Sequence, residues 1–367
     1  MALLDGGQRV EGPVAGYVYA LVATIIVAGT TLSCAPAGDE APLVAEPPVE
    51  GTSNFHFEYE GLSSAKVEQL RQQEALDEIT TAARTDLEVF EALTLWARQQ
   101  FEPGFPDPYP LSNGVDILAD IRSGKTSGFC GQYAYLLADA LKSFGYFDVR
   151  YVETFASEDE SHFLVEVWSN RLARWILLDP LYAAIVVDED GTPLSTWDVH
   201  AIAAGRGPAG ARRKWLAPET EVPREPDEQF FALFRLPAIS LRNNLARETM
   251  PWSIPERRQQ FLALRDDINA DLLPGYYLQE SNRKEDFTAA RNTCRIEALT
   301  AVDGIVLRLD NLGTSTHFWK FQISIDDGEW HDAAWETLHP GGFRTIDCVP
   351  VNRKGVRGVA TRLTLKD

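Results

Sequence analysis

The sequence predicts an α+β protein, with a helix packed on an antiparallel sheet, followed by an all-β sandwich of immunoglobulin-like type. Three observations favour this class. Residues 129–144 carry apolar side chains at spacings of three and four, which is a helical period. Two strand-like segments rich in Val, Leu, Ile and Trp follow at 161–168 and 175–179. From residue 291 onward, short segments alternate apolar and polar residues between turn signals, as in a sandwich.

Length and composition favour more than one structural unit. The chain has 367 residues, of which 45% are hydrophobic and 10% aromatic, enough to bury a core. Its formal net charge of −20 argues against nucleic acid and anionic membrane surfaces as partners. We divide the chain into a signal peptide or membrane anchor at 1–34, a flexible linker at 35–54, a helix-and-sheet domain at 55–215, a mixed helical and irregular extension at 216–290, and a sandwich at 291–367.

Residues 14–33 form a long apolar run near the N-terminus, which predicts an export signal or an anchor. Three outcomes stay open. Thr31–Cys34 resembles a bacterial lipobox that would leave Cys34 lipidated, Ala35–Ala37 fits a signal-peptidase site, and an uncleaved run of about 20 residues would span a bilayer. We favour a lipoprotein, exported to the periplasm or cell surface and touching the membrane only through its N-terminal lipid or anchor. The Pro-, Ala-, Gly- and Glu-rich segment 35–54 would be its tether.

Two helices and a proline-rich loop precede the central helix. The spacing of apolar residues predicts helices at 62–83 and 86–101, the second with an apolar stripe. The segment 103–110 contains prolines at 103, 106, 108 and 110, which remove backbone donors and bar regular helix. We therefore expect a loop there, in a position to wall a cleft beside Cys130.

Cys130 lies in the first turn of the helix predicted at 129–144, which Ser127 or Gly128 would cap and Gly145 would end. Unpaired backbone N–H groups and the positive end of the helix dipole stabilise an anion at this position. A cysteine placed there is easier to ionise, and the thiolate is the reactive form of the side chain.

His162 and Asp179 lie on the two predicted strands that follow this helix. A polar link joins the strands, so they should pair as an antiparallel hairpin. If the turn centres between Asn170 and Arg171, His162 lies directly opposite Asp179 on the same face. The carboxylate would fix the imidazole tautomer and leave the second ring nitrogen for Cys130. A slip of one residue would separate the pair, so the prediction depends on the register.

Several segments resemble, in this order, the transglutaminase-like superfamily, whose papain-related fold uses a Cys-His-Asp triad. They are Val115–Leu118, Gly128–Tyr133, Ser161–Trp168 and Trp175–Pro180, and together they cover roughly residues 85–185. The resemblance implies acyl transfer on a protein or peptide substrate. Cys130 would attack an amide, His162 would carry the proton, and Asp179 would orient His162. Water at the resulting thioester would give peptide hydrolysis or deamidation, and an amine would give transfer.

The oxyanion hole is only half assigned by the sequence. The backbone N–H of Cys130 would supply one donor. Animal relatives add a tryptophan upstream of the cysteine. Here Trp96 lies upstream but within a predicted helix, and the loop at 101–111 offers only Tyr109 as a polar aromatic residue. The second donor therefore stays unassigned.

The alternative function is a non-catalytic cell-surface protein that uses the same fold to recognise or assemble with protein or glycan. Neither interpretation needs a cofactor. We predict no metal, because the remaining histidines lack Zn-ligand spacing and the acidic turn at 188–191 lacks the pattern of a calcium loop. In an exported protein, Cys294 and Cys348 are expected to pair as a disulfide, which leaves Cys130 as a free thiol. The oligomeric state stays open.

Overall fold

The computed structural model describes residues 43–45, 53–157, 159–250, 259–272, 277–302, 304–312, 317–339 and 342–365. The predicted signal or anchor at 1–34, including Cys34, and most of the predicted linker lie outside these residues. None of the helices within the described ranges has the length and apolar character that crossing a bilayer requires.

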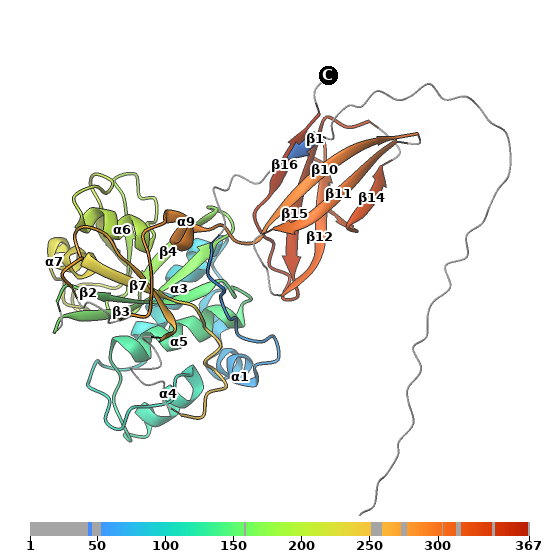
Figure 1. Ribbon diagram of the computed structural model, residues 1–367. Coiled ribbons are helices and arrows are strands. Elements are labelled where there is room, and N and C mark those ends of the chain that lie inside the picture. Colours follow the sequence, from blue (N-terminus) through green and yellow to red (C-terminus); the bar gives the residue numbers. More distant parts are fainter. Residues whose placement is uncertain are drawn as a thin grey trace, which may run out of the picture. The chain divides into compact units, whose positions relative to one another are not determined.

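The part of the chain that holds the predicted site is an eight-stranded sheet with helices packed against it (Figure 1). Its strand order is β6-β5-β4-β3-β2-β7-β8-β9, and all neighbours are antiparallel except β8 and β9. The strands are β2 Val149–Phe155, β3 Ser161–Ser169, β4 Arg174–Asp179, β5 Ala184–Val187, β6 Arg212–Trp215, β7 Leu236–Ser240, β8 Phe261–Leu264 and β9 Gln279–Ser281. The protein is thus of the mixed α+β class, as predicted.

Helix α5 Cys130–Ser143 lies at the centre of the helical layer and contacts β2 and β3 of the sheet. It is buried nearly all round, because helices α1, α3 and α4 cover the sides that the sheet leaves open. Gly145 follows its end with φ of +91°, as the predicted C-cap requires. The helices are α1 Ala65–Gln73, α2 Leu76–Ile79, α3 Asp86–Arg98, α4 Gly114–Arg122, α6 Thr196–Ala203, α7 Asp227–Ala232 and α9 Lys284–Thr288, with a 3₁₀ turn η1 at Leu233–Arg235.

A buried ion cluster fixes the C-terminal end of α5. Lys142 is fully buried, and its ammonium lies 2.6 Å from Asp139 and 3.7 Å from Glu60. The same ammonium donates to the backbone oxygen of Asn243 at 2.9 Å, and Asp139 accepts from the N–H of Gly114 at 2.8 Å. Because each charge has a partner, the cluster can hold α5 in place without leaving an unpaired buried ion.

The C-terminal part consists of two four-stranded antiparallel sheets in the orders β1-β10-β11-β14 and β13-β12-β15-β16. Both contribute to one apolar cluster that includes Ile296, Leu307, Phe321 and Ile346. The strands are β1 Leu43–Ala45, β10 Thr293–Ala301, β11 Gly304–Leu312, β12 Phe318–Ile325, β13 His331–Ala333, β14 Glu336–His339, β15 Thr345–Asn352 and β16 Thr361–Thr364. This part is all-β, and its immunoglobulin-like topology stays a prediction.

Two segments differ from the structure that their composition predicts. Leu43–Ala45, expected within a flexible linker, forms β1 and pairs with β10. Residues 216–290, expected as a mixed helical and irregular extension, supply β7, β8 and β9 to the main sheet. Strands of three to five residues are too short to show a period of two, so pairing with a sheet edge decides their structure.

Cys294 on β10 and Cys348 on β15 are buried free thiols, so the predicted disulfide is wrong for this structure. The two residues are nevertheless close, because Cys294 Sγ donates to the backbone oxygen of Cys348 at 3.2 Å. Both cysteines lie in the all-β part, but the sequence does not determine where each sulfur points. Here the sulfur of Cys294 is directed at a carbonyl group.

Candidate active site

Cys130 is the first residue of α5, a half-buried free thiol at the helix start. Phe129, and neither Ser127 nor Gly128, occupies the N-cap position, and its N–H donates to Gln132 Oε1 at 3.0 Å. Gly128 has a packing role instead, since a Cβ there would lie 2.5 Å from the ring of Phe101. The N-cap prediction was therefore wrong, while the position of Cys130 in the first turn is as predicted.

The β3–β4 hairpin brings His162 and Asp179 together through a register that differs from the predicted one. Trp175 pairs with Trp168, whereas the predicted register pairs it with Glu166, a displacement of two residues. An even displacement leaves side chains on the same face of the sheet. His162 Nε2 consequently lies 2.9 Å from Asp179 Oδ2.

The Asp179 carboxylate is held from two sides. Its Oδ2 faces His162, and its Oδ1 accepts from the backbone N–H groups of Leu181 at 3.1 Å and Tyr182 at 3.2 Å. Both side chains of the pair are buried, with His162 5% and Asp179 2% exposed. The chain reversal after β4 therefore fixes the carboxylate, and the carboxylate fixes the imidazole ring.

Cys130 also lies beside His162 and helps to raise its pKa, so the thiol, the imidazole and the carboxylate are a series of neighbouring side chains. With Nε2 taken by Asp179, Nδ1 is the ring nitrogen left for the sulfur. Burial lowers the pKa of His162, but the Asp179 carboxylate, its hydrogen bond to the ring and the neighbouring Cys130 outweigh burial and raise this pKa from 6.5 to about 10. The imidazole is therefore protonated at neutral pH and can stabilise a thiolate beside it.

Aromatic rings shield the imidazole from solvent. The ring of Tyr182 lies edge-on with its centroid 5.8 Å from that of His162, and the ring of Phe230 lies at 6.5 Å. A site from which water is excluded strengthens the interaction between charged groups inside it. The aromatic shield therefore favours the interaction between His162 and Asp179.

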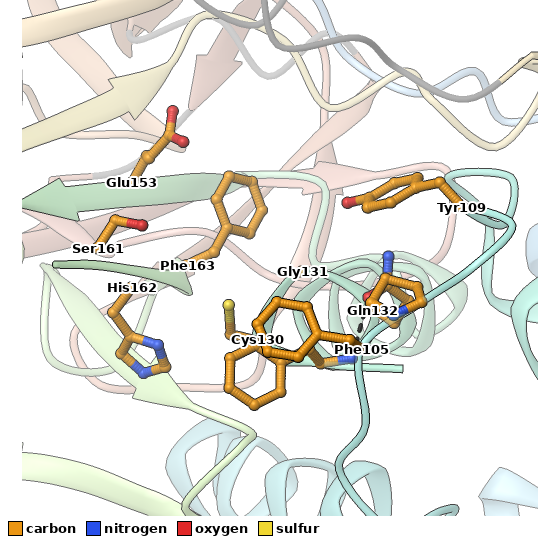
Figure 2. A pocket seen from close by; sticks show the side chains of 11 residues that line it. Phe105, Tyr109, Cys130, Gly131, Gln132, Glu153, Ser161, His162 and Phe163 are labelled. Carbon is orange, nitrogen blue, oxygen red and sulfur yellow. Dashed lines mark hydrogen bonds between the residues drawn. The ribbon is translucent and has the colours of Figure 1, made fainter. Parts of the chain in front are cut away.

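Cys130 and His162 open into a pocket of about 260 Å³ (Figure 2). Its wall is built by the proline-rich loop, the start of α5 and strands β2 and β3, through Phe105, Pro106, Tyr109, Phe129, Cys130, Gly131, Gln132, Glu153, Ser161, His162 and Phe163. The ring of Phe105 stacks on Phe129 at 5.4 Å, and Gly104 N–H donates to Gly128 O at 2.8 Å. The predicted wall beside Cys130 is thus present.

Sequence reasoning gave no site role to three polar residues of the pocket, Gln132, Glu153 and Ser161. Gln132 lies in the first turn of α5, and Glu153 lies on β2, where it accepts from the hydroxyl of Tyr277 at 3.3 Å. A glutamate in a strand segment that also carries Val, Tyr and Phe is a signal that could have been noticed. Trp96 packs in the main core on α3 and is not among the pocket residues, whereas Tyr109 lines the pocket.

No group of three or more His, Cys, Asp or Glu side chains is arranged to hold a metal ion within the ranges that the structure describes. In the acidic turn at 188–191, a side-chain carboxylate instead accepts hydrogen bonds from nearby backbone N–H groups. Asp188 Oδ1 accepts from the N–H groups of Asp190 at 3.0 Å and Thr192 at 2.8 Å. This pattern is that of an ordinary turn closed by an aspartate side chain.

Comparison with known proteins identifies one region of the chain. Residues 73–180 match the family model of the transglutaminase-like superfamily, and this range contains Cys130, His162 and Asp179. No curated protein and no solved structure matches the chain.

Proposed function

Because residues 73–180 form a domain of the transglutaminase-like superfamily, we propose that the protein is a thiol enzyme that acts on amide bonds of protein or peptide substrates. The observation that carries this proposal is that Cys130 and His162 line one pocket, with Asp179 hydrogen-bonded to His162 behind the imidazole. A thiol at a helix start, a base beside it and a carboxylate behind the base are the parts that nucleophilic catalysis needs.

In the proposed reaction, the Cys130 thiolate forms a bond to the amide carbonyl carbon, and the C=O π electrons move onto oxygen. When the C=O bond re-forms, the C–N bond breaks, and the leaving nitrogen takes a proton from His162. The product on the enzyme is a thioester. Water or an amine then attacks the thioester carbon and gives its proton to His162, and the thiolate leaves. A raised pKa of His162, about 10, supports its role as the proton donor to the amine.

Alkylation by iodoacetamide tests whether Cys130 is an activated thiol. Cys294 and Cys348 are buried at 0% exposure, so mild treatment should label Cys130 ahead of them. The label is located by mass spectrometry of tryptic peptides, with Cys130→Ala as the control. His162→Gln should slow alkylation at neutral pH, because the thiolate loses its cationic partner. An inert Cys130 would favour the alternative, a binding or assembly protein without turnover.

A second measurement separates hydrolysis from transfer. A casein substrate is offered together with a fluorescent primary amine, and the wild type is compared with Cys130→Ala. Incorporation of the amine that is lost in Cys130→Ala indicates transfer, whereas cleavage or ammonia release alone indicates hydrolysis or deamidation.

Two finer features belong to the same proposal. We infer that the C-terminal pair of sheets is an immunoglobulin-type sandwich, since its two sheets share one core between them. We also infer export and tethering of the protein as a lipoprotein through Cys34, on the sequence pattern of residues 14–34. Metabolic labelling with a radioactive fatty acid, lost in Cys34→Ser, tests the tether.

A further inference from the structure

Arg213 carries a buried positive charge. It lies on β6, and only 4% of the residue is exposed. Its Nε donates to Asp227 Oδ1 at 2.8 Å, and its Nη2 donates to the backbone oxygen of Glu225. Its Nη1 has no hydrogen-bond partner among the described residues. A buried cation lowers stability unless its surroundings compensate for the lost water, so hydrogen bonding alone does not explain this burial.

Three aromatic rings surround the guanidinium of Arg213. Its central carbon lies 4.5 Å from the ring centroid of Trp215, 4.7 Å from that of Phe230 and 5.8 Å from that of Tyr182. A guanidinium within about 6 Å of a ring centroid is attracted to the electron-rich face of the ring. Since Trp215 is on β6, Phe230 on α7 and Tyr182 in the chain reversal after β4, Arg213 ties three parts of the fold together.

Two of these three rings are the ones that shield His162. The rings of Tyr182 and Phe230 both lie edge-on to the imidazole. Tyr182 also donates its backbone N–H to Asp179 Oδ1 at 3.2 Å. The hydrogen bond from Asp179 fixes Nε2 of His162, but a single bond leaves the ring free to tilt, because the second side-chain torsion of histidine is broad. Packed ring edges restrict that tilt.

We propose that Arg213 is a positioning residue of the candidate active site. It holds the rings of Tyr182 and Phe230 against His162, and these rings keep the imidazole beside the thiol. Arg213 is not among the pocket residues, so it acts through the rings and takes no part in the bond changes. The inference rests on the proposed function and adds to it a requirement that the matched family range does not meet, since Arg213 and Phe230 both lie beyond that range.

Two substitutions at Arg213 separate stacking from charge. Arg213→Lys keeps the positive charge but loses the flat guanidinium that covers the rings, and Arg213→Met keeps an apolar stem without any charge. If neither variant folds, Asp227→Asn carries the test. It is similar in size, lies at a half-buried position and removes the carboxylate that anchors the guanidinium.

Arg150 on β2 provides a matched control. It is a buried guanidinium as well, with 6% of the residue exposed. Its Nε donates to Glu166 Oε2 at 2.7 Å, and its central carbon lies 3.8 Å from the ring centroid of Trp175. Trp175 lies near the start of β4, whereas Asp179 is the last residue of that strand. Arg150→Lys and Arg150→Met should therefore lower the stability of the protein without moving the imidazole.

The rate at which iodoacetamide alkylates Cys130, recorded against pH, is the readout. This rate follows the fraction of thiolate, which a protonated imidazole beside the sulfur increases. A displaced imidazole stabilises the thiolate less, so the thiol ionises at a higher pH. We expect both Arg213 variants to shift the midpoint of the profile upward by about one pH unit, which slows alkylation about tenfold at any pH below the midpoint. Asp227→Asn should shift it in the same direction.

The Arg150 variants should keep the wild-type midpoint, because a fall in stability alone does not change the ionisation of a thiol in a protein that stays folded. Circular dichroism at each pH checks that every variant is folded. An unchanged profile in the Arg213 variants would overturn the inference, and so would an unchanged profile in Asp227→Asn if the Arg213 variants do not fold.

Two other results would also overturn the inference. A wild-type profile in Arg213→Lys together with a shift in Arg213→Met would assign the effect to charge instead of stacking. Equal shifts in the Arg150 variants would show that the loss of any buried arginine has this effect. The proposed function fails in a different way, because wild-type Cys130 would then resist alkylation at every pH at which the protein is folded.

Discussion

Replacing Asp179 with asparagine tests how far the carboxylate controls the charge of His162. Asn is close to Asp in size, and its amide oxygen can still accept from the N–H groups of Leu181 and Tyr182. The change removes the negative charge that lies 2.9 Å from His162 Nε2. Burial, which lowers the pKa of His162, is then opposed only by Cys130. We expect this pKa to fall from about 10 toward its ordinary value of 6.5 or below.

The effect on stability follows from the same two pKa values. The pKa of His162 is about 10 in the folded protein and 6.5 in the unfolded reference. Each pKa unit is worth about 1.4 kcal/mol. At pH 7 the unfolded imidazole is already partly neutral, so protonation of His162 contributes on the order of 4 kcal/mol there. Because the folded pKa is the raised one, this contribution is complete below pH 6.5 and is lost as pH rises through about 10.

Urea unfolding of the wild type and Asp179→Asn, repeated between about pH 6 and pH 11, measures the difference in the free energy of unfolding. The difference should be several kcal/mol at the acidic end and should shrink through the alkaline range. NMR titration of the His162 ring gives the pKa directly. A difference that does not change with pH, or a wild-type His162 pKa near 6.5, would refute the reasoning.

Three further changes have defined outcomes. Lys142→Met leaves two buried carboxylates without their cation, so the free energy of unfolding measured in urea should fall by about 3–5 kcal/mol. A fall of less than about 1 kcal/mol would show that the ion cluster does not stabilise the protein. Phe105 is 85% exposed at the pocket and can contact an apolar substrate side chain, so Phe105→Ala should raise the KM for apolar peptides about tenfold. Acylation by the small ester p-nitrophenyl acetate should not change. An unchanged KM would mean that the substrate does not contact Phe105. Cys294 and Cys348 are free thiols, so dithiothreitol should leave the free energy of unfolding in urea unchanged. A loss of about 4 kcal/mol on reduction would reveal a disulfide and contradict this.

The residues of the site could be found from the sequence because short-range rules place them. The apolar period of α5 and the helix stop at Gly145 position Cys130 in the first turn. The prediction that His162 lies beside Asp179 is correct although the predicted register is wrong by two residues. Side chains two residues apart in a strand lie on the same face of the sheet, so a displacement of two keeps the pair on one face. An error of one residue would have put the two side chains on opposite faces.

Features that depend on tertiary packing could not be predicted in this way. The helix predicted at 62–83 is broken into α1 and α2 at Ala75, which has φ of +49°. The N-cap was misplaced because Gly128 is needed for its close contact with Phe101, which no local pattern encodes.

Strand β1 has a practical meaning for work with shortened forms of this protein. In its sheet β1 is the outermost strand and covers one edge of β10. A truncation that starts at the predicted boundary, residue 55, keeps every pocket residue but strips this cover. Bare strand edges recruit other chains and promote aggregation. Expression of the protein should therefore begin no later than Leu43, even when only the chemistry of the thiol is of interest.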